Sequence, residues 1–153
     1  MVKSFEAFVS SHPRNPLPDK LTWQSAATRV DNRADWLIID KLAPRNTKDA
    51  PLEDLNRFGD IGKLMFENTE PNGRVDLVQA GNTVKATTRG VAEFTLLLSP
   101  DVFDFSKAVR IETNGNLAFE GTVAKSVETL SKWAAHDNDR TMLFGAEVHV
   151  KVK

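Results

Sequence analysis

The sequence predicts a mostly β protein, a two-sheet immunoglobulin-like β-sandwich of about seven to eight strands with one late helix and a short N-terminal helix. Segments with the two-residue period of a strand recur along the chain, and turn residues separate them. Residues 4–11 and 126–136 instead carry apolar residues at helical spacing. "Immunoglobulin-like" describes the architecture alone, because the chain has no Cys for the domain's disulfide and no Tyr for its tyrosine corner.

Length and charge limit the classes of function. The 153 residues fit one domain, and 20 Lys and Arg residues are evenly mixed with 21 Asp and Glu residues. We therefore expect no nucleic-acid partner, since the basic stripe of such proteins is absent. No apolar run is long enough for a membrane span, and residues 1–11 lack the apolar block of a secretory signal. The sequence leaves the oligomeric state and the compartment open.

The first 19 residues differ from the rest of the chain. Phe5, Phe8 and Val9 have helical spacing within residues 4–11. Three prolines, Pro13, Pro16 and Pro18, then favour a stiff, extended connector. We predict a helix and linker over residues 1–19 and a sandwich domain over residues 20–153.

Strand periodicity begins at Lys20. The expected strands cover residues 20–25, 34–41, 75–80, 83–88, 91–98, 109–113, 117–123 and 142–152. Two of these segments, 34–41 and 91–98, are apolar on both faces, which suits central strands of a covered sheet. The last segment alternates strictly and should face the core on one side and solvent on the other.

Two hairpins can be given a register. Gly81-Asn82 suits a two-residue type II′ turn that pairs Leu77 with Ala86 and Val75 with Thr88. At Asn114-Gly115-Asn116, a two-residue loop would place Ile111 opposite Ala118. A three-residue loop with a left-handed bulge instead places Ile111 opposite Phe119 and Thr113 opposite Leu117. We favour the three-residue loop because it keeps one face apolar.

The late helix is expected over residues 126–136. Ser126 is a suitable N-cap and Glu128 stands in the first turn. Val127, Leu130 and Ala134 form a predicted core-facing stripe, to which Trp133 is a further candidate.

Residues 43–72 fit the strand pattern poorly. We expect a short helix near residues 52–58, within a connection longer than most. Leu64, Met65 and Phe66 should be buried in the fold, in a partner, or in a short extra strand.

The search for catalytic and metal-binding motifs is mostly negative. The chain contains neither a nucleophile elbow nor a phosphate-binding or dinucleotide-binding glycine motif. We expect His12, His136 and His149 to be solvated or capping residues, and Asp101 and Asp104 to belong to a turn. Asp137-Asn138-Asp139 resembles the start of a calcium loop, but Met142 and Val148 stand where Gly and Glu are needed. We therefore predict no catalytic residue, metal or cofactor.

The three tryptophans are expected in the core, because indoles carry a large apolar surface. Trp36 lies within a segment that is apolar on both faces. Trp23 and Trp133 are also candidates for stacking on a carbohydrate or polymer.

Several blocks of sequence together resemble a known family. They are residues 13–18 (PRNPLP), 21–23 (LTW), 32–40 (NRADWLIID), 84–92 (VKATTRGVA), 105–109 (FSKAV), 114–115 (NG) and 119–123 (FEGTV). Over roughly residues 13–150 the chain is similar to the C-terminal β-rich domain of bacterial putative esterases of the polyhydroxyalkanoate-depolymerase and prolyl-oligopeptidase type. The resemblance implies an α/β-hydrolase domain before this one. That domain would carry the catalytic triad, and residues 4–11 would be its tail or the link from it.

We thus expect a non-catalytic accessory domain that packs on a serine esterase domain and shapes its substrate access. The candidate partner interface comprises Phe5, Phe8, Pro13, Arg14, Pro16, Pro18, Leu64, Met65 and Phe66. A polymer- or carbohydrate-binding module is the second hypothesis, and a stand-alone hydrolase is the third.

Overall fold

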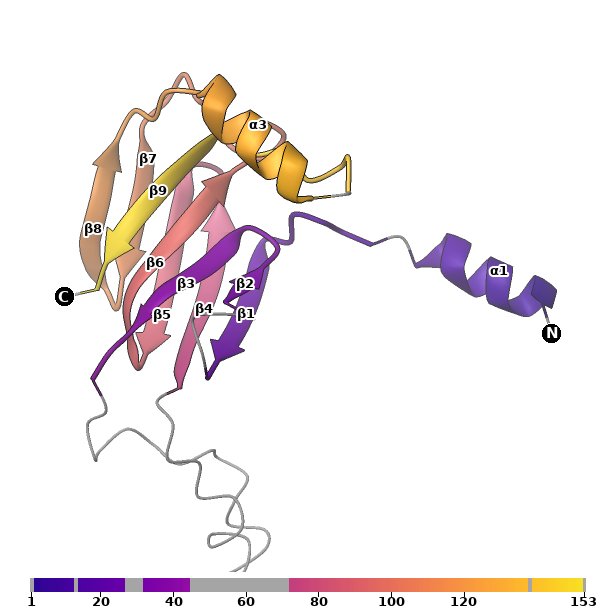
Figure 1. Cartoon of the computed structure of the whole chain (residues 1–153), viewed down its shortest axis with the longest axis horizontal. Helices are drawn as coiled ribbons and strands as arrows, with labels where there is room; N and C mark the ends of the chain where they lie inside the picture. Colours follow the sequence, from indigo (N-terminus) through magenta and orange to yellow (C-terminus); the bar gives the residue numbers. More distant parts are fainter. Residues whose placement is uncertain (1, 13, 27–31, 45–71, 138, 153) are drawn as a thin grey trace, which may run out of the picture.

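The computed structural model describes residues 2–12, 14–26, 32–44, 72–137 and 139–152, with the side chains of α1 described from Phe5 onward. These residues form two packed sheets and two helices, so the predicted two-sheet sandwich is confirmed (Figure 1). The immunoglobulin-like description is not confirmed. The described residues form nine strands where about seven to eight were predicted, because residues 33 and 34 form a separate two-residue strand.

Two sheets share the strands unequally. The five-stranded sheet has the order β1-β4-β5-β7-β8, and the four-stranded sheet has the order β2-β3-β6-β9. The strands are β1 (Lys20–Ser25), β2 (Arg33–Ala34), β3 (Leu37–Leu42), β4 (Gly73–Ala80), β5 (Thr83–Arg89), β6 (Val91–Leu98), β7 (Val109–Thr113), β8 (Asn116–Gly121) and β9 (Ala146–Lys151). The pairings between these strands are antiparallel except that of β5 with β7.

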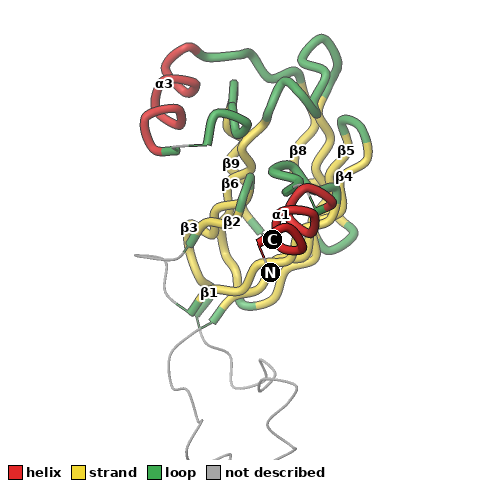
Figure 2. The backbone as a smooth tube through the Cα atoms, turned by 90° about the vertical axis from the view of Figure 1, so that its right-hand side faces the viewer, coloured by secondary structure: helices red, strands yellow, loops and turns green. Residues whose placement is uncertain are grey.

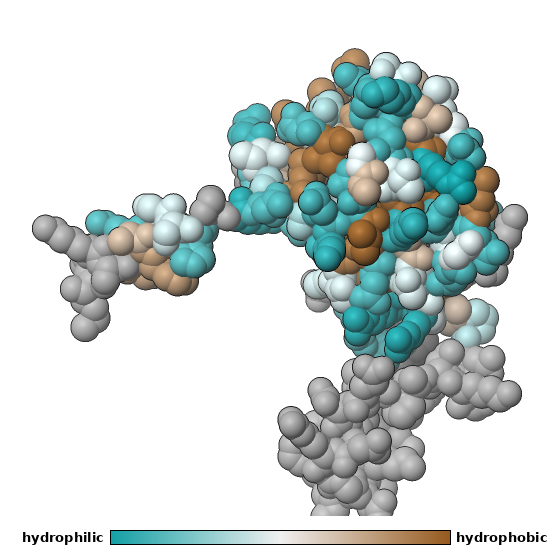
Figure 3. All heavy atoms as spheres, turned by 180° about the vertical axis from the view of Figure 1, so that it is seen from behind, coloured by the Kyte–Doolittle hydropathy of each residue, from teal (hydrophilic) through white to brown (hydrophobic). Residues whose placement is uncertain are grey.

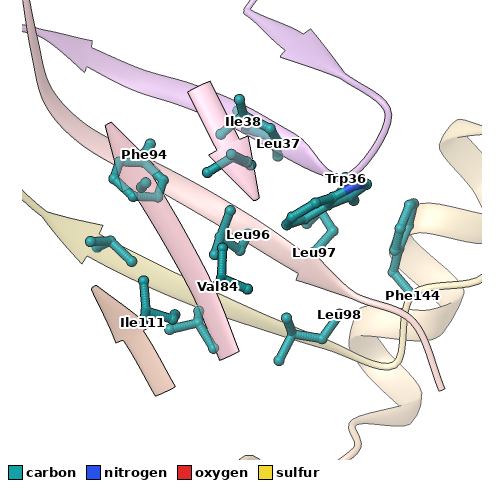
Figure 4. Close-up of a cluster of buried hydrophobic side chains, with 14 of the residues drawn as sticks. Trp36, Leu37, Ile38, Val84, Phe94, Leu96, Leu97, Leu98, Ile111 and Phe144 are labelled. Carbon is teal, nitrogen blue, oxygen red and sulfur yellow. The ribbon is translucent and has the colours of Figure 1, made fainter. Parts of the chain in front are cut away.

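The core lies between the two sheets. Phe94, Leu96 and Leu98 of β6 gather with Val84 and Ile111 of the five-stranded sheet, and each is fully buried (Figure 4). Strand β6 is central in its sheet, between β3 and β9, as its sequence predicts. Helix α3 (Val127–His136) lies on the outer side of the four-stranded sheet (Figures 1 and 2).

The first hairpin has the predicted register. Leu77 pairs with Ala86 and Val75 pairs with Thr88. Gly81 has a φ of +56°, while Asn82 does not have a positive φ, as a type II′ turn requires.

The second hairpin confirms one predicted pair and corrects the other. Ile111 lies opposite Phe119, but Thr113 pairs with Asn116 instead of Leu117. The loop has two residues, because Asn114 and Gly115 both accept the left-handed conformation, at φ values of 52° and 81°. A bulge at Ala118 absorbs the extra residue, so that Ile111 still faces Phe119 while the exposed Leu117 lies opposite Glu112.

Two predictions near the C-terminus were partly wrong. The last strand begins at Ala146 and not at Met142, although Met142 and Phe144 are buried before it. In α3, the Ser126 hydroxyl accepts the backbone N–H of Thr129, which confirms the N-cap. The predicted core stripe is wrong: Trp133 is the buried residue, and Val127 and Leu130 are 81% and 38% exposed. The helix is oriented by the contacts of one large indole, not by its longest apolar stripe.

Candidate interaction surface

Helix α1 (Val2–Ser11) stands away from the sandwich (Figure 1). Phe5, Phe8 and Val9 are 68%, 59% and 52% exposed. At about 100° per residue they share one side of the helix, and the space-filling view shows apolar residues gathered on one side of this detached element (Figure 3). The predicted helix is therefore present, and its apolar side faces solvent.

Local hydrogen bonds cap the C-terminal end of α1. The Ser11 hydroxyl donates to the carbonyl of Phe8 at 2.9 Å, and the His12 backbone N–H donates to the carbonyl of Val9 at 3.2 Å. The His12 ring also stacks on the Phe8 ring, with 4.3 Å between the ring centres. These contacts satisfy carbonyls at the helix end and fix the Phe8 side chain.

The strap, residues 14–19, packs on the sandwich. Trp36 donates its indole N–H to the carbonyl of Pro18 at 3.2 Å, and the backbone N–H of Gln79 donates to the carbonyl of Asp19 at 2.7 Å. Leu17 is half-buried against the core. Beneath the strap lies a cavity of about 10 Å³, room for one water molecule. Leu17, Pro18, Trp36, Gln79, Leu97, Ser99, Val102 and Phe103 line it.

Arg14 ties the start of the strap to two loops. Its guanidinium lies 2.9 Å from the carboxylate of Asp35 and 3.4 Å from that of Asp139. Hydrogen bonds from the hydroxyl and then the backbone N–H of Thr141 are the main reasons that the pKa of Asp139 is lowered, and Arg14 lowers it further. These two ion pairs hold Arg14, three residues after the end of α1, against the domain.

The structure thus separates the predicted interface residues into groups. Phe5 and Phe8 are exposed, whereas Pro16 and Pro18 are half-buried against the sandwich. Arg14 is exposed but engaged by two carboxylates. Pro13, Leu64, Met65, Phe66 and the helix expected near residues 52–58 lie outside the described residues.

The three tryptophans present little free surface. Trp36 is 3% exposed and lies in the core, as predicted. Trp133 is 7% exposed; it donates its indole N–H to Glu147, and the Arg33 guanidinium lies 4.6 Å from its ring centre. Trp23 is half-buried against the core, with no hydrogen-bond partner for its buried indole nitrogen. The burial of Trp133 leaves it no open indole face, whereas Trp23 keeps part of its surface exposed.

A polar cluster on the outer face of the four-stranded sheet was missed from sequence. The Thr95 hydroxyl donates to Asp40 at 2.7 Å and lies 3.2 Å from Nδ1 of His149. Nε2 of His149 lies 3.1 Å from the carboxylate of Glu93. His149 is therefore partnered, not simply solvated as expected. The pairing of β3, β6 and β9 assembles the cluster from residues distant in sequence, so only a correct strand order could have revealed it.

This cluster brings a hydroxyl, an imidazole and carboxylates together on the outer face of the four-stranded sheet. The Thr95 residue is 8% exposed, and its hydroxyl is already bonded to Asp40. The cavity described above lies elsewhere, beneath the strap. Within the described part of the chain, no three His, Asp or Glu side chains are grouped to hold a metal. Asp137 and Asp139 of the calcium-like segment are instead paired with Arg33 and Arg14.

The described residues define a class of protein, a mostly β two-sheet sandwich with a projecting amphipathic helix. None of their helices is long and apolar enough to cross a membrane. Comparison with family models, curated proteins and solved structures finds no match.

Proposed function

We propose that this chain is a non-catalytic accessory domain that docks on a partner protein through the apolar side of α1. The observation that carries the proposal is the exposure of Phe5, Phe8 and Val9 on a helix held clear of its own domain. An isolated helix of this length is only marginally stable in water, so a packed apolar side is its expected source of stability. Burial of each Phe ring would contribute about 1.5–3 kcal/mol.

The strap supports this role by fixing the root of the helix. Its contacts with Asp35, Trp36 and Gln79 hold residues 14–19 on the sandwich. The mount keeps the C-terminal end of α1 within a few residues of the sandwich, so docking of the helix would bring the whole domain to the partner.

The proposed partner is an α/β-hydrolase domain of the serine esterase type. This choice comes from the sequence resemblance, in which such a domain precedes the β-rich one. The catalytic triad would belong to that partner, and the sandwich would shape access to its active site.

The decisive experiment measures binding of this chain to the separated hydrolase domain by calorimetry, together with that domain's ester hydrolysis. The variant F5A/F8A should bind at least roughly ten-fold more weakly. Leu117→Ala is the matched control, since Leu117 is 47% exposed but lies on β8, at the opposite edge of the five-stranded sheet from β1, which follows the strap. Absence of binding, or equal loss in both variants, would overturn the proposal.

A further inference from the structure

Helix α3 carries a second apolar side without a described partner. Val127 and Leu130 are 81% and 38% exposed, and Ala134 is exposed one turn further on. These three residues lie about a quarter turn from the buried Trp133. The stripe is therefore accessible beside the sheet contact, although its sequence pattern is that of a packed helix side.

The strap begins next to the end of this helix. Asp137 is the C-cap of α3, and Arg14 contacts Asp139 and the sulfur of Met142 directly after it. Only a short connection separates Ser11, the last residue of α1, from Arg14. A chain extends by at most about 3.3–3.6 Å per residue. The three residues from Ser11 to Arg14 can span at most about 10 Å, so the C-terminal end of α1 is tethered close to the C-terminal end of α3.

The two helices also match in length and pattern. Each has 10 residues, and each has apolar side chains along one side. If α1 turned back after Ser11, Val9 would meet Ala134, while Phe8 and Phe5 would run along Leu130 toward Val127. Tethering raises the local concentration of α1 at this surface far above that of a separate protein.

From these observations we infer that α1 has a second, closed position, in which its apolar side packs on the Val127–Leu130–Ala134 stripe of its own α3. The open position described above exposes both stripes, and the closed position hides both. A regulatory role for the closed position rests on the proposed function, because closure would compete with docking of α1 on the hydrolase domain. The fold-back itself can be tested without any partner.

The absence of cysteine from the sequence makes disulfide trapping direct. The variant V9C/A134C should form an intramolecular disulfide under mild oxidation, seen as a faster-migrating monomer and as one linked tryptic peptide pair. The matched control A7C/A134C has the same tether, but residue 7 lies on the opposite side of α1. The test pair should cross-link roughly ten-fold faster than the control.

A further variant checks the stripe itself. Adding Val127→Asp to V9C/A134C should remove most of that advantage. Because Val127 is 81% exposed, the variant should keep its fold, which circular dichroism checks. Equal rates for the test and control pairs would overturn closure. So would a product that is mainly a disulfide-linked dimer, because α1 would then occupy a second copy.

Failure of closure and failure of docking are distinguishable. If the reduced chain binds the hydrolase domain and the cross-linked chain does not, both inferences stand. If the disulfide forms but the reduced chain binds no hydrolase domain, closure stands and the proposed function falls.

Discussion

The guanidinium of Arg33 donates two hydrogen bonds to the carboxylate of Asp137, at 2.6 and 3.2 Å. Both side chains are 19% exposed. The same guanidinium lies 4.6 Å from the centre of the Trp133 ring and 5.4 Å from that of Phe144. One residue of β2 thus fastens the C-terminal end of α3 to the four-stranded sheet.

Replacement of Arg33 by Ala should lower the free energy of unfolding by about 2 kcal/mol, between the values for exposed and buried ion pairs. Removal of the guanidinium leaves Asp137 unpaired and uncovers the indole of Trp133. Urea denaturation followed by Trp fluorescence measures the change. The control is Arg14→Ala, whose 63% exposed side chain should contribute less than about 1 kcal/mol. Equal losses would contradict the assigned role of Arg33.

Gly90, between β5 and β6, should not tolerate a side chain. Its φ is +62°, and an added Cβ would lie 2.3 Å from the carbonyl oxygen of Asn72. Gly90→Ala should therefore cost about 3 kcal/mol from steric overlap and backbone strain. Gly81→Ala separates the two effects, because Gly81 has a φ of +56° but nothing within 4 Å. That control should cost only about 1 kcal/mol in thermal or urea unfolding.

Asn82 joins the β4–β5 turn to residues 104–108. Its side-chain amide donates to the carbonyl of Asp104 at 2.7 Å, and its side-chain oxygen accepts the Asp104 backbone N–H at 2.9 Å. Asn82→Ala should lower stability by about 1–2 kcal/mol and increase amide hydrogen exchange in that loop. Asn116→Ala removes one long, exposed hydrogen bond and should have almost no effect. Unchanged exchange at residues 104–108 would count against this connection.

Stability should fall as the solution is acidified. Asp76, Asp104, Asp139 and Glu147 all have lowered pKa values, and that of Asp104 is about 2, chiefly because Ser106 and Lys107 bond to its carboxylate. The unfolded chain therefore binds more protons than the folded one, and the free energy of unfolding should decrease from about pH 5 down to about pH 2.

Glu147 offers a specific check of this pH dependence. Burial alone would raise the pKa of its carboxyl, but hydrogen bonds from Lys132 and Trp133 together lower it. Glu147→Gln should flatten part of the slope between pH 5 and pH 3, measured by urea denaturation at each pH. A slope identical to that of the unsubstituted chain would show that this carboxylate is not involved.

The elements with local signals were predictable from the sequence. Gly81-Asn82 defined its hairpin register, and Ser126 marked the start of α3, because turn and capping chemistry act over a few residues. The orientation of α3 was not predictable in this way. Its apolar stripe suggested one buried side, whereas the contacts of Trp133 with Arg33 and Glu147 selected another.

The candidate surfaces also differ in whether a local sequence signal could reveal them. The exposure of Phe5 and Phe8 agrees with their place outside the strand pattern. That place can be recognised in the sequence without knowledge of distant contacts. The cluster of Thr95 and His149, which are 54 positions apart, depends on the pairing of β6 with β9. Periodicity contains no information about such partners.

The parallel contact between β5 and β7 constrains the order of assembly. After β5 the chain crosses to the opposite sheet as β6, and it returns only at β7, whose Ile111 lies beside Val84. The five-stranded sheet therefore cannot grow by adding successive hairpins. Because β6 of the other layer lies between β5 and β7 in the chain, we expect both layers to gain protection in the same kinetic phase, more slowly than the β4–β5 hairpin alone.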